Sequence, residues 1–143
     1  MLKIRFIPVL LIKGERCVKG ANFSNFRDTG NPVTNARIYD SQGADELIVL
    51  DIEKNNRNLY YKQVQEIADQ CFMPLAFWGG VKGVSDVRKL MKIGADKIVI
   101  NTEAVREPKI ITRISQRFGA QAVVVSIDAM RKGNKYEVYI QNE

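Results

Sequence analysis

The sequence contains no histidine, and only two of its 143 residues are cysteine. Without histidine, a Ser-His-Asp triad, a Cys-His nucleophile pair and any His-containing zinc site are excluded. Cys17 and Cys71 lie far apart and outside a CxxC pattern, so reduced thiols are favoured over a metal or redox site. We therefore expect no metal and no cofactor. Any acid–base chemistry must use Asp, Glu, Lys, Tyr or Cys.

Long apolar runs are also missing. No run approaches the roughly 20 residues of a transmembrane helix, and the N-terminus lacks the cleavage site of a signal peptide. We expect a cytoplasmic protein that does not contact membranes. The 22 basic and 16 acidic residues give a net charge of +6, but the basic residues are spread along the chain. This spread favours a solvated basic surface over nucleic-acid binding, and it is compatible with an anionic small-molecule ligand.

A hydrophobic content of 45% excludes global disorder and suits one domain with a real core. Along the chain, short apolar runs alternate with helical patterns, and this order predicts a parallel sheet with helical crossovers. Pro8 argues against part of the first predicted strand, because proline has no backbone N–H to donate to a neighbouring strand. The predicted strands are Ile4–Ile12, Glu46–Ile52, Pro74–Trp78, Lys97–Ile100 and Ala122–Ile127, with Lys135–Gln141 as an exposed hairpin strand. The predicted helices are Pro32–Gln42, Asn58–Phe72, Asp86–Ile93 (N-cap Ser85) and Pro108–Phe118, and Lys13–Asn31 is predicted as a polar loop.

The sequence repeats itself in part. GADELIVLDIE begins at Gly43 and GADKIVINTE begins at Gly94, 51 residues later (94 − 43). Each segment follows a predicted helix and leads into a buried strand. A period of two strand–helix units favours a barrel built from duplicated pieces, although similar local structure alone could also produce so short a match.

Polar residues and glycines follow several of the predicted strands. In parallel α/β folds, ligands bind at the carboxyl ends of the strands. Gly79-Gly80 before a helix allows a close approach to an anion, and Asn101-Thr102 strengthens a phosphate interpretation over a bare turn. Asp51 and Asp128 each follow an apolar run, and two strand-end aspartates favour a site over simple caps.

The opposite ends of the strands also carry charge. Arg5, Glu46 and Lys97 lie near the starts of three predicted strands. If these side chains point inward they must pair, because an isolated buried charge costs several kcal/mol. Either they form a charged ring that closes the barrel bottom, or they are three solvent-facing strand ends.

Several motifs together resemble one family. They are R-x-I-P-x-L from Arg5, V-K-G-x-N-F from Val18 and R-D-x-G from Arg27. Further motifs are D-E-L-x-x-L-D-I from Asp45, G-A-D-K-x-x-I-N-T-x-A-V from Gly94 and F-G-x-Q-A-V-V-V-x-I-D-A from Phe118. The whole chain resembles the N-terminal half of the cyclase subunit of imidazole glycerol phosphate synthase. The resemblance implies a (β/α)₈ barrel that receives ammonia from a glutaminase docked at its bottom.

The resemblance also implies roles for individual residues. Asp128 matches one of two catalytic aspartates, Lys19 lies in the mobile loop over the active site, and Asp51 matches a substrate contact. The phosphate-binding residues would be Gly80, Asn101 and Thr102, the ammonia gate would be Arg5, Glu46 and Lys97, and Asp96 would face the glutaminase.

Two positions depart from the family pattern. Leu11 stands where the second catalytic aspartate is expected, and Trp78 replaces the first residue of a triple glycine. Leucine can neither donate nor accept a proton, and loss of such a group typically costs two or more powers of ten in rate.

The P-x-L-L start resembles a divergent branch that converts an acetamido sugar to an acetamidino sugar for surface polysaccharide. We therefore favour this amidation, acting on an anionic phosphorylated or nucleotide-sugar ligand. The alternatives are the histidine-pathway cyclase and a non-catalytic partner that conducts ammonia or acts as a scaffold.

The length is short for this fold, because a (β/α)₈ barrel takes about 250 residues. We expect a single domain over residues 1–143: a partial barrel of about four βα units plus a fifth strand and a hairpin strand, incomplete at its C-terminus. An open barrel leaves strand edges and an apolar face uncovered. The chain is thus predicted to be a truncation or fragment, or to complete itself by self-association or by pairing with another chain.

Overall fold

The computed structural model describes residues 3–21, 24–53 and 56–140. Its main feature is a seven-stranded sheet in the order β3-β2-β1-β4-β5-β6-β7. β1, β4, β5, β6 and β7 are parallel, whereas β2 and β3 extend the sheet antiparallel beyond β1. The strands are β1 (Val9–Lys13), β2 (Arg16–Ala21), β3 (Ser24–Gly30), β4 (Leu47–Asp51), β5 (Leu75–Trp78), β6 (Lys97–Ile100) and β7 (Val123–Val125).

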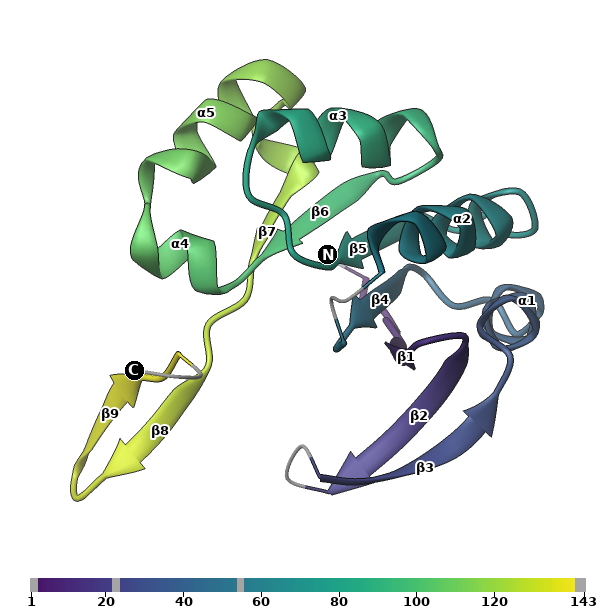
Figure 1. Cartoon of the computed structure of the whole chain (residues 1–143), viewed down its shortest axis with the longest axis horizontal. Coiled ribbons are helices and arrows are strands. Elements are labelled where there is room, and N and C mark those ends of the chain that lie inside the picture. The colour runs from purple at the N-terminus through teal and green to yellow at the C-terminus, as the bar shows by residue number, and fades with distance from the viewer. Residues whose placement is uncertain (1–2, 22–23, 54–55, 141–143) are drawn as a thin grey trace.

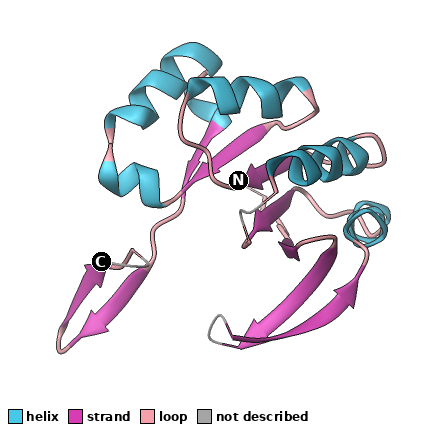
Figure 2. Cartoon of the chain, in the orientation of Figure 1, coloured by secondary structure: helices cyan, strands magenta, loops and turns pink. Residues whose placement is uncertain are grey.

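Helices connect the parallel strands and lie along one face of the sheet (Figure 1). Figure 2 shows the same alternation of helix and strand along the chain, which confirms the predicted parallel sheet with helical crossovers. A last hairpin, β8 with β9, stands apart from the rest of the chain (Figure 1). The remaining elements are α1 (Pro32–Ser41), α2 (Arg57–Ala68), α3 (Val84–Lys92), α4 (Thr102–Arg106), α5 (Lys109–Phe118), the 3₁₀ turn η1 (Ala120–Ala122), β8 (Ala129–Lys132) and β9 (Lys135–Val138).

The structure corrects several predicted elements. The segment predicted as a polar loop, Lys13–Asn31, instead forms the β2–β3 hairpin, whose mostly exposed residues carry no apolar run that would mark a strand. The first strand begins at Val9 rather than Ile4. Helix α3 begins after Gly83, so Ser85 lies within the helix and is not its N-cap. The short elements α4 and β8 were not predicted, while the exposed hairpin strand is confirmed up to Val138, and Gln141 lies outside the described residues.

The hydrophobic core lies between the parallel sheet and the helices. In β4 the buried residues alternate with half-buried ones, which places Leu47 and Val49 towards the helices and Ile48 and Leu50 on the opposite face. That opposite face corresponds to the inside of a barrel. The helix-facing core includes Ile12, Leu47, Val49, Phe77, Ile98 and Ile100 from strands and Val64, Ile67, Leu90, Ile110 and Ile114 from helices.

Both cysteines are free and buried, and burial raises the pKa of the Cys17 and Cys71 thiols. This agrees with the reduced thiols predicted from the sequence. Among residues 3–21, 24–53 and 56–140, no helix is long and apolar enough to cross a membrane. The same residues contain no group of three or more His, Cys, Asp or Glu side chains that could hold a metal ion.

The repeated sequence has a structural counterpart. The Asp45 N–H donates to the Phe6 carbonyl (3.0 Å), and the Asp45 carboxylate accepts from the Phe6 N–H (2.8 Å). At the equivalent position, the Asp96 N–H donates to the Leu75 carbonyl (2.9 Å) and its carboxylate accepts from the Leu75 N–H (2.8 Å). Each aspartate thus makes the same two hydrogen bonds to the backbone of one residue on the neighbouring segment, so the two copies of the motif have the same structural role.

The equivalent glycines of the repeat provide a matched test of packing. At Gly94 (φ +111°) an added Cβ would lie 2.3 Å from Ala68 Cβ, whereas at Gly43 (φ +77°) it would meet nothing within 4 Å. We expect Gly94→Ala to lower the free energy of unfolding by about 2–4 kcal/mol, since both positive φ and overlap oppose it. Gly43→Ala should cost about 1 kcal/mol, from the backbone alone. Urea denaturation measures both, and equal losses would contradict this packing.

Candidate functional site

One polar cluster forms where β6 and β7 end. Asn101 Nδ2 donates to Asp128 Oδ2 (3.0 Å) and to Ser126 Oγ (3.3 Å). Thr102 Oγ1 donates to Asn101 Oδ1 (3.3 Å), and Thr102 is the first residue of α4. The structure therefore brings together three predicted site residues, Asn101, Thr102 and Asp128. The Asp128 side chain is exposed, so its carboxylate is accessible to a ligand.

The Gly79-Gly80 turn follows β5 and abuts α2. An added Cβ at Gly79 would lie 2.8 Å from the Tyr60 ring, and Gly80 has a φ of +52°, so both positions require glycine. Arg57, at the start of α2, donates from Nη1 to the Gly79 carbonyl and from Nη2 to the Tyr61 hydroxyl (2.8 Å). This arginine was not predicted as a site residue. A cation in the first turn of a helix opposes the helix dipole, and that signal could have singled it out.

Asp51 ends β4 but lies beside α2. It is 7% exposed, its Oδ1 accepts from the Glu53 N–H (3.0 Å), and it lines a small cavity of about 40 Å³ with Tyr60 and Gln63. Burial, followed by the nearby Asp51 charge, raises the pKa of the Tyr60 hydroxyl. In strand register Asp51 aligns with Ile12, whose side chain belongs to the helix-facing core. The structure therefore does not unite Asp51 with Asp128 in one cluster.

An apolar row occupies the opposite face of the same strand ends. Leu11 of β1 aligns with Leu50 of β4, and Leu50 aligns with Trp78 of β5. Residues in register on parallel strands share a face, and all three are half-buried rather than packed under the helices. The structure thus places Leu11, the position where the resemblance implies an aspartate, in an apolar row at the strand ends.

Lys19 lies on the β2–β3 hairpin. It is exposed and pairs in strand register with Arg27. The described hydrogen bonds and ion pairs do not join it to the Asn101 cluster.

The charged residues near the starts of the parallel strands form ion pairs with one another. Glu46, 3% exposed, accepts from Lys97 Nζ at 2.6 Å and from Arg5 Nη1 at 3.3 Å, both at Oε2. The Lys97 side chain is 24% exposed and that of Arg5 58%. Glu46 precedes β4 on the same face as Ile48 and Leu50, which is the inside of the partial barrel. The structure thus favours the paired charged cluster over three separate solvent-facing strand ends.

Asp96 adjoins this pole. It is exposed, and its carboxylate is engaged by the Leu75 N–H, as described above. These hydrogen bonds to the start of β5 explain why an aspartate is found at position 96 without invoking a glutaminase partner.

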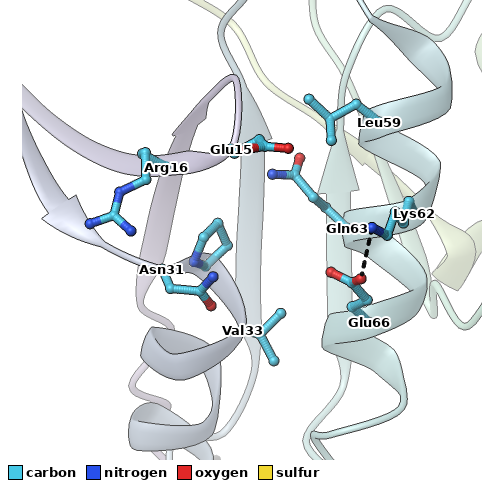
Figure 3. Close-up of a pocket in the computed structure, with 9 residues that line it drawn as sticks. Glu15, Arg16, Asn31, Val33, Leu59, Lys62, Gln63 and Glu66 are labelled. Atoms are coloured by element: carbon cyan, nitrogen blue, oxygen red, sulfur yellow. Dashed lines mark ion pairs between the residues drawn. The ribbon is translucent and has the colours of Figure 1, made fainter.

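A cavity larger than the one beside Asp51 lies elsewhere. It has a volume of about 250 Å³ and opens between the β2–β3 hairpin, α1 and α2 (Figure 3). An exposed Lys62–Glu66 ion pair (3.6 Å) forms part of its wall. None of the predicted site residues lines it; the lining residues are Glu15, Arg16, Asn31, Pro32, Val33, Leu59, Lys62, Gln63 and Glu66. The candidate site is therefore a surface at the strand ends and not this cavity.

Comparison with known sequences identifies the family of the chain. The sequence model described as "Histidine biosynthesis protein" matches residues 5–143, nearly the whole chain. The chain belongs to this family. Members of the family are TIM barrels, so the parallel strands and helical crossovers are part of a (β/α)₈ barrel, as predicted.

A curated relative narrows the comparison within the family. The chain is 49% identical over 135 residues to the imidazole glycerol phosphate synthase subunit HisF of Thermobifida fusca (strain YX). The matched region is 93% of this chain and 53% of the relative, so the chain spans about half the relative's length. The predicted resemblance to the N-terminal half of the cyclase subunit is thereby confirmed.

Proposed function

We propose that this chain forms the N-terminal half of an ammonia-using synthase subunit. The observation that carries the proposal is the arrangement of two polar centres at opposite ends of one parallel sheet. The Asn101–Asp128 cluster lies where barrel enzymes bind ligands, and the Glu46 cluster lies at the other end, inside the barrel. Ammonia released by a glutaminase docked near Lys97 would enter at the second centre and react at the first.

The histidine-pathway cyclase is the candidate that the comparisons favour. The relative with 49% identity is named as a subunit of imidazole glycerol phosphate synthase. This favours the histidine-pathway alternative over the sugar amidation preferred from sequence. Because the Asn101 amide and the Thr102 hydroxyl already donate within the cluster, a phosphate group of such a substrate would be bound by backbone N–H groups of Asn101, Thr102 and the Gly79-Gly80 turn. Asp128 would supply one carboxylate.

Amidation of an acetamido sugar remains as a second candidate because of one specific observation. Leu11, Leu50 and Trp78 form an apolar row at the barrel mouth, where a two-carboxylate mechanism needs its second carboxylate. A ligand with an acyl group or the C–H face of a sugar ring suits such a surface. A non-catalytic, ammonia-conducting role is the third candidate, and it is tested below through Asp128.

The open sheet supports completion of the barrel by further protein. β7 pairs only with β6 within the described sheet, and Val125 and Ile127 are 40% and 61% exposed. An exposed apolar edge strand is a template for additional strands. The remaining strands would come from a longer chain, a second copy or a separate partner.

Complementation of a strain that lacks the histidine-pathway cyclase tests the first candidate. If this chain restores growth without histidine, when expressed with a glutaminase subunit, the cyclase proposal is supported and sugar amidation is rejected. The matched variant Leu11→Asp restores the second carboxylate. Growth with Leu11→Asp but not with the wild-type chain would show that Leu11 is what separates the chain from cyclase activity. Failure of both would count against cyclase activity of the half-length chain by itself.

A further inference from the structure

Arg57 connects three separate elements around the Gly79-Gly80 turn. Its guanidinium donates to the Gly79 carbonyl, donates to the Tyr61 hydroxyl at 2.8 Å and forms an ion pair with Asp86 at 3.3 Å. It also lies over the Tyr61 ring, 5.2 Å from the ring centre. The side chains of Arg57 and Asp86 are only 31% and 22% exposed, so this contact is sheltered from solvent. The guanidinium is therefore held in one orientation by its neighbours.

This fixed guanidinium determines how the turn presents its donors. In a trans peptide the C=O and the following N–H point in opposite directions. The Gly79 carbonyl accepts from Arg57 on α2, so the Gly80 N–H of the same peptide points away from the Arg57 guanidinium. A peptide between two glycines rotates easily, because glycine accepts both signs of φ. The contact of the Gly79 carbonyl with Arg57 therefore restricts rotation of this peptide and holds the Gly80 N–H on the side away from Arg57.

The far side of the turn is anchored by the same network. Asp86, near the start of α3, accepts from the Lys82 N–H at 2.9 Å while it pairs with Arg57. The segment from Gly79 to Asp86 is therefore tied at both ends to one arginine. An added Cβ at Gly80 would lie 3.0 Å from Arg57 Nη1, which shows how closely the side chain approaches the turn.

We infer that Arg57 is a positioning residue that orients the Gly80 N–H towards a phosphate group bound at the strand ends. The inference rests on the proposed function in one respect, namely that this edge of the sheet binds a phosphorylated ligand. In this role Arg57 acts through the backbone: its contacts with Gly79, Tyr61 and Asp86 hold the guanidinium beside the turn. Its contribution is the direction of one hydrogen bond.

Titration of the chain with inorganic phosphate, followed by ³¹P NMR or calorimetry, tests this role. We expect Arg57→Ala to raise the dissociation constant for phosphate about 10-fold, the size of one lost hydrogen bond to a charged group. Arg57→Gln keeps an N–H donor for the Gly79 carbonyl and should stay within about threefold of wild type. Arg113→Ala removes the same charge from an exposed pair with Glu107 and serves as the control, with no expected change.

The outcomes separate the inference from the proposed function. No phosphate binding by the wild-type chain would overturn both the phosphate site and the role of Arg57. Binding by wild type that is unchanged in Arg57→Ala would overturn the role of Arg57 alone. A loss in Arg57→Gln as large as in Arg57→Ala would show that charge acts at a distance, and would also overturn the orienting role. Circular dichroism melting confirms that each variant is folded during the titration.

Discussion

Asp128→Asn is expected to lower ammonia-dependent turnover about 100-fold or more in the synthase proposed above. Asp128 is the carboxylate of the strand-end cluster, and an amide at this position cannot accept a proton at neutral pH. The geometry should survive, because the Asn101 Nδ2 donor that now meets Asp128 Oδ2 at 3.0 Å can donate equally to an amide oxygen. The loss would therefore report chemistry rather than folding. Steady-state kinetics with saturating ammonium salt measures it.

The other acceptor of Asn101 provides the matched control. Ser126 Oγ accepts from the same amide nitrogen at 3.3 Å but carries no carboxylate. Ser126→Ala should change turnover by less than about threefold, because only one neutral hydrogen bond is lost. If Asp128→Asn stays within twofold of wild type, the catalytic proposal fails and the ammonia-conducting or scaffolding role becomes the better account.

Lys97→Ala is expected to lower the free energy of unfolding by about 2–4 kcal/mol. It removes the partner that lies 2.6 Å from the Glu46 carboxylate, and Glu46 is only 3% exposed. The remaining partner, Arg5, is 58% exposed and meets the same oxygen at 3.3 Å, so it compensates only in part. Replacing both members by apolar groups, as in Glu46→Leu with Lys97→Met, should recover much of the loss. Urea denaturation measures the three proteins.

An exposed ion pair serves as the control for the stability change in Lys97→Ala, and turnover measurements test whether Lys97 also gates ammonia. Lys132 and Glu137 are 3.2 Å apart with side chains 74% and 59% exposed, so Lys132→Ala should cost less than about 0.5 kcal/mol. If Lys97 gates ammonia, Lys97→Ala also lowers glutamine-dependent turnover more than turnover with free ammonium. Equal rates with both nitrogen sources, relative to wild type, would argue against a gate while leaving the stability result intact.

The sequence predicted those parts of the fold that depend on local apolar patterning. The runs around Val49, Ile98 and Val124 marked parallel strands because both faces of such strands are covered. The β2–β3 hairpin was missed for the opposite reason: its strands are held by pairing with β1, and few of their side chains are buried. The alternation of apolar and polar residues that indicates a strand in a sequence is therefore absent from β2 and β3.

The candidate site was predictable where it depends on strand order and unpredictable where it depends on long-range contacts. Asn101 and Asp128 meet because neighbouring parallel strands end at one edge, and the sequence order already implied this. Asp51 also ends a strand, but the alternation of faces within β4 turns it towards α2. Arg57 reaches Gly79 across 22 positions, and no pattern in the sequence expresses such a contact.

The ion pair of Glu46 with Lys97 joins equivalent positions of the repeated motif, since each residue follows Gly-Ala-Asp. Two identical copies of the motif would place two glutamates or two lysines face to face, and like charges at that distance repel. Because the residue after Gly-Ala-Asp is acidic in one copy of the motif and basic in the other, the two copies attract each other where they meet. The ion pair at the barrel bottom therefore depends on the two copies of the motif differing at this one position.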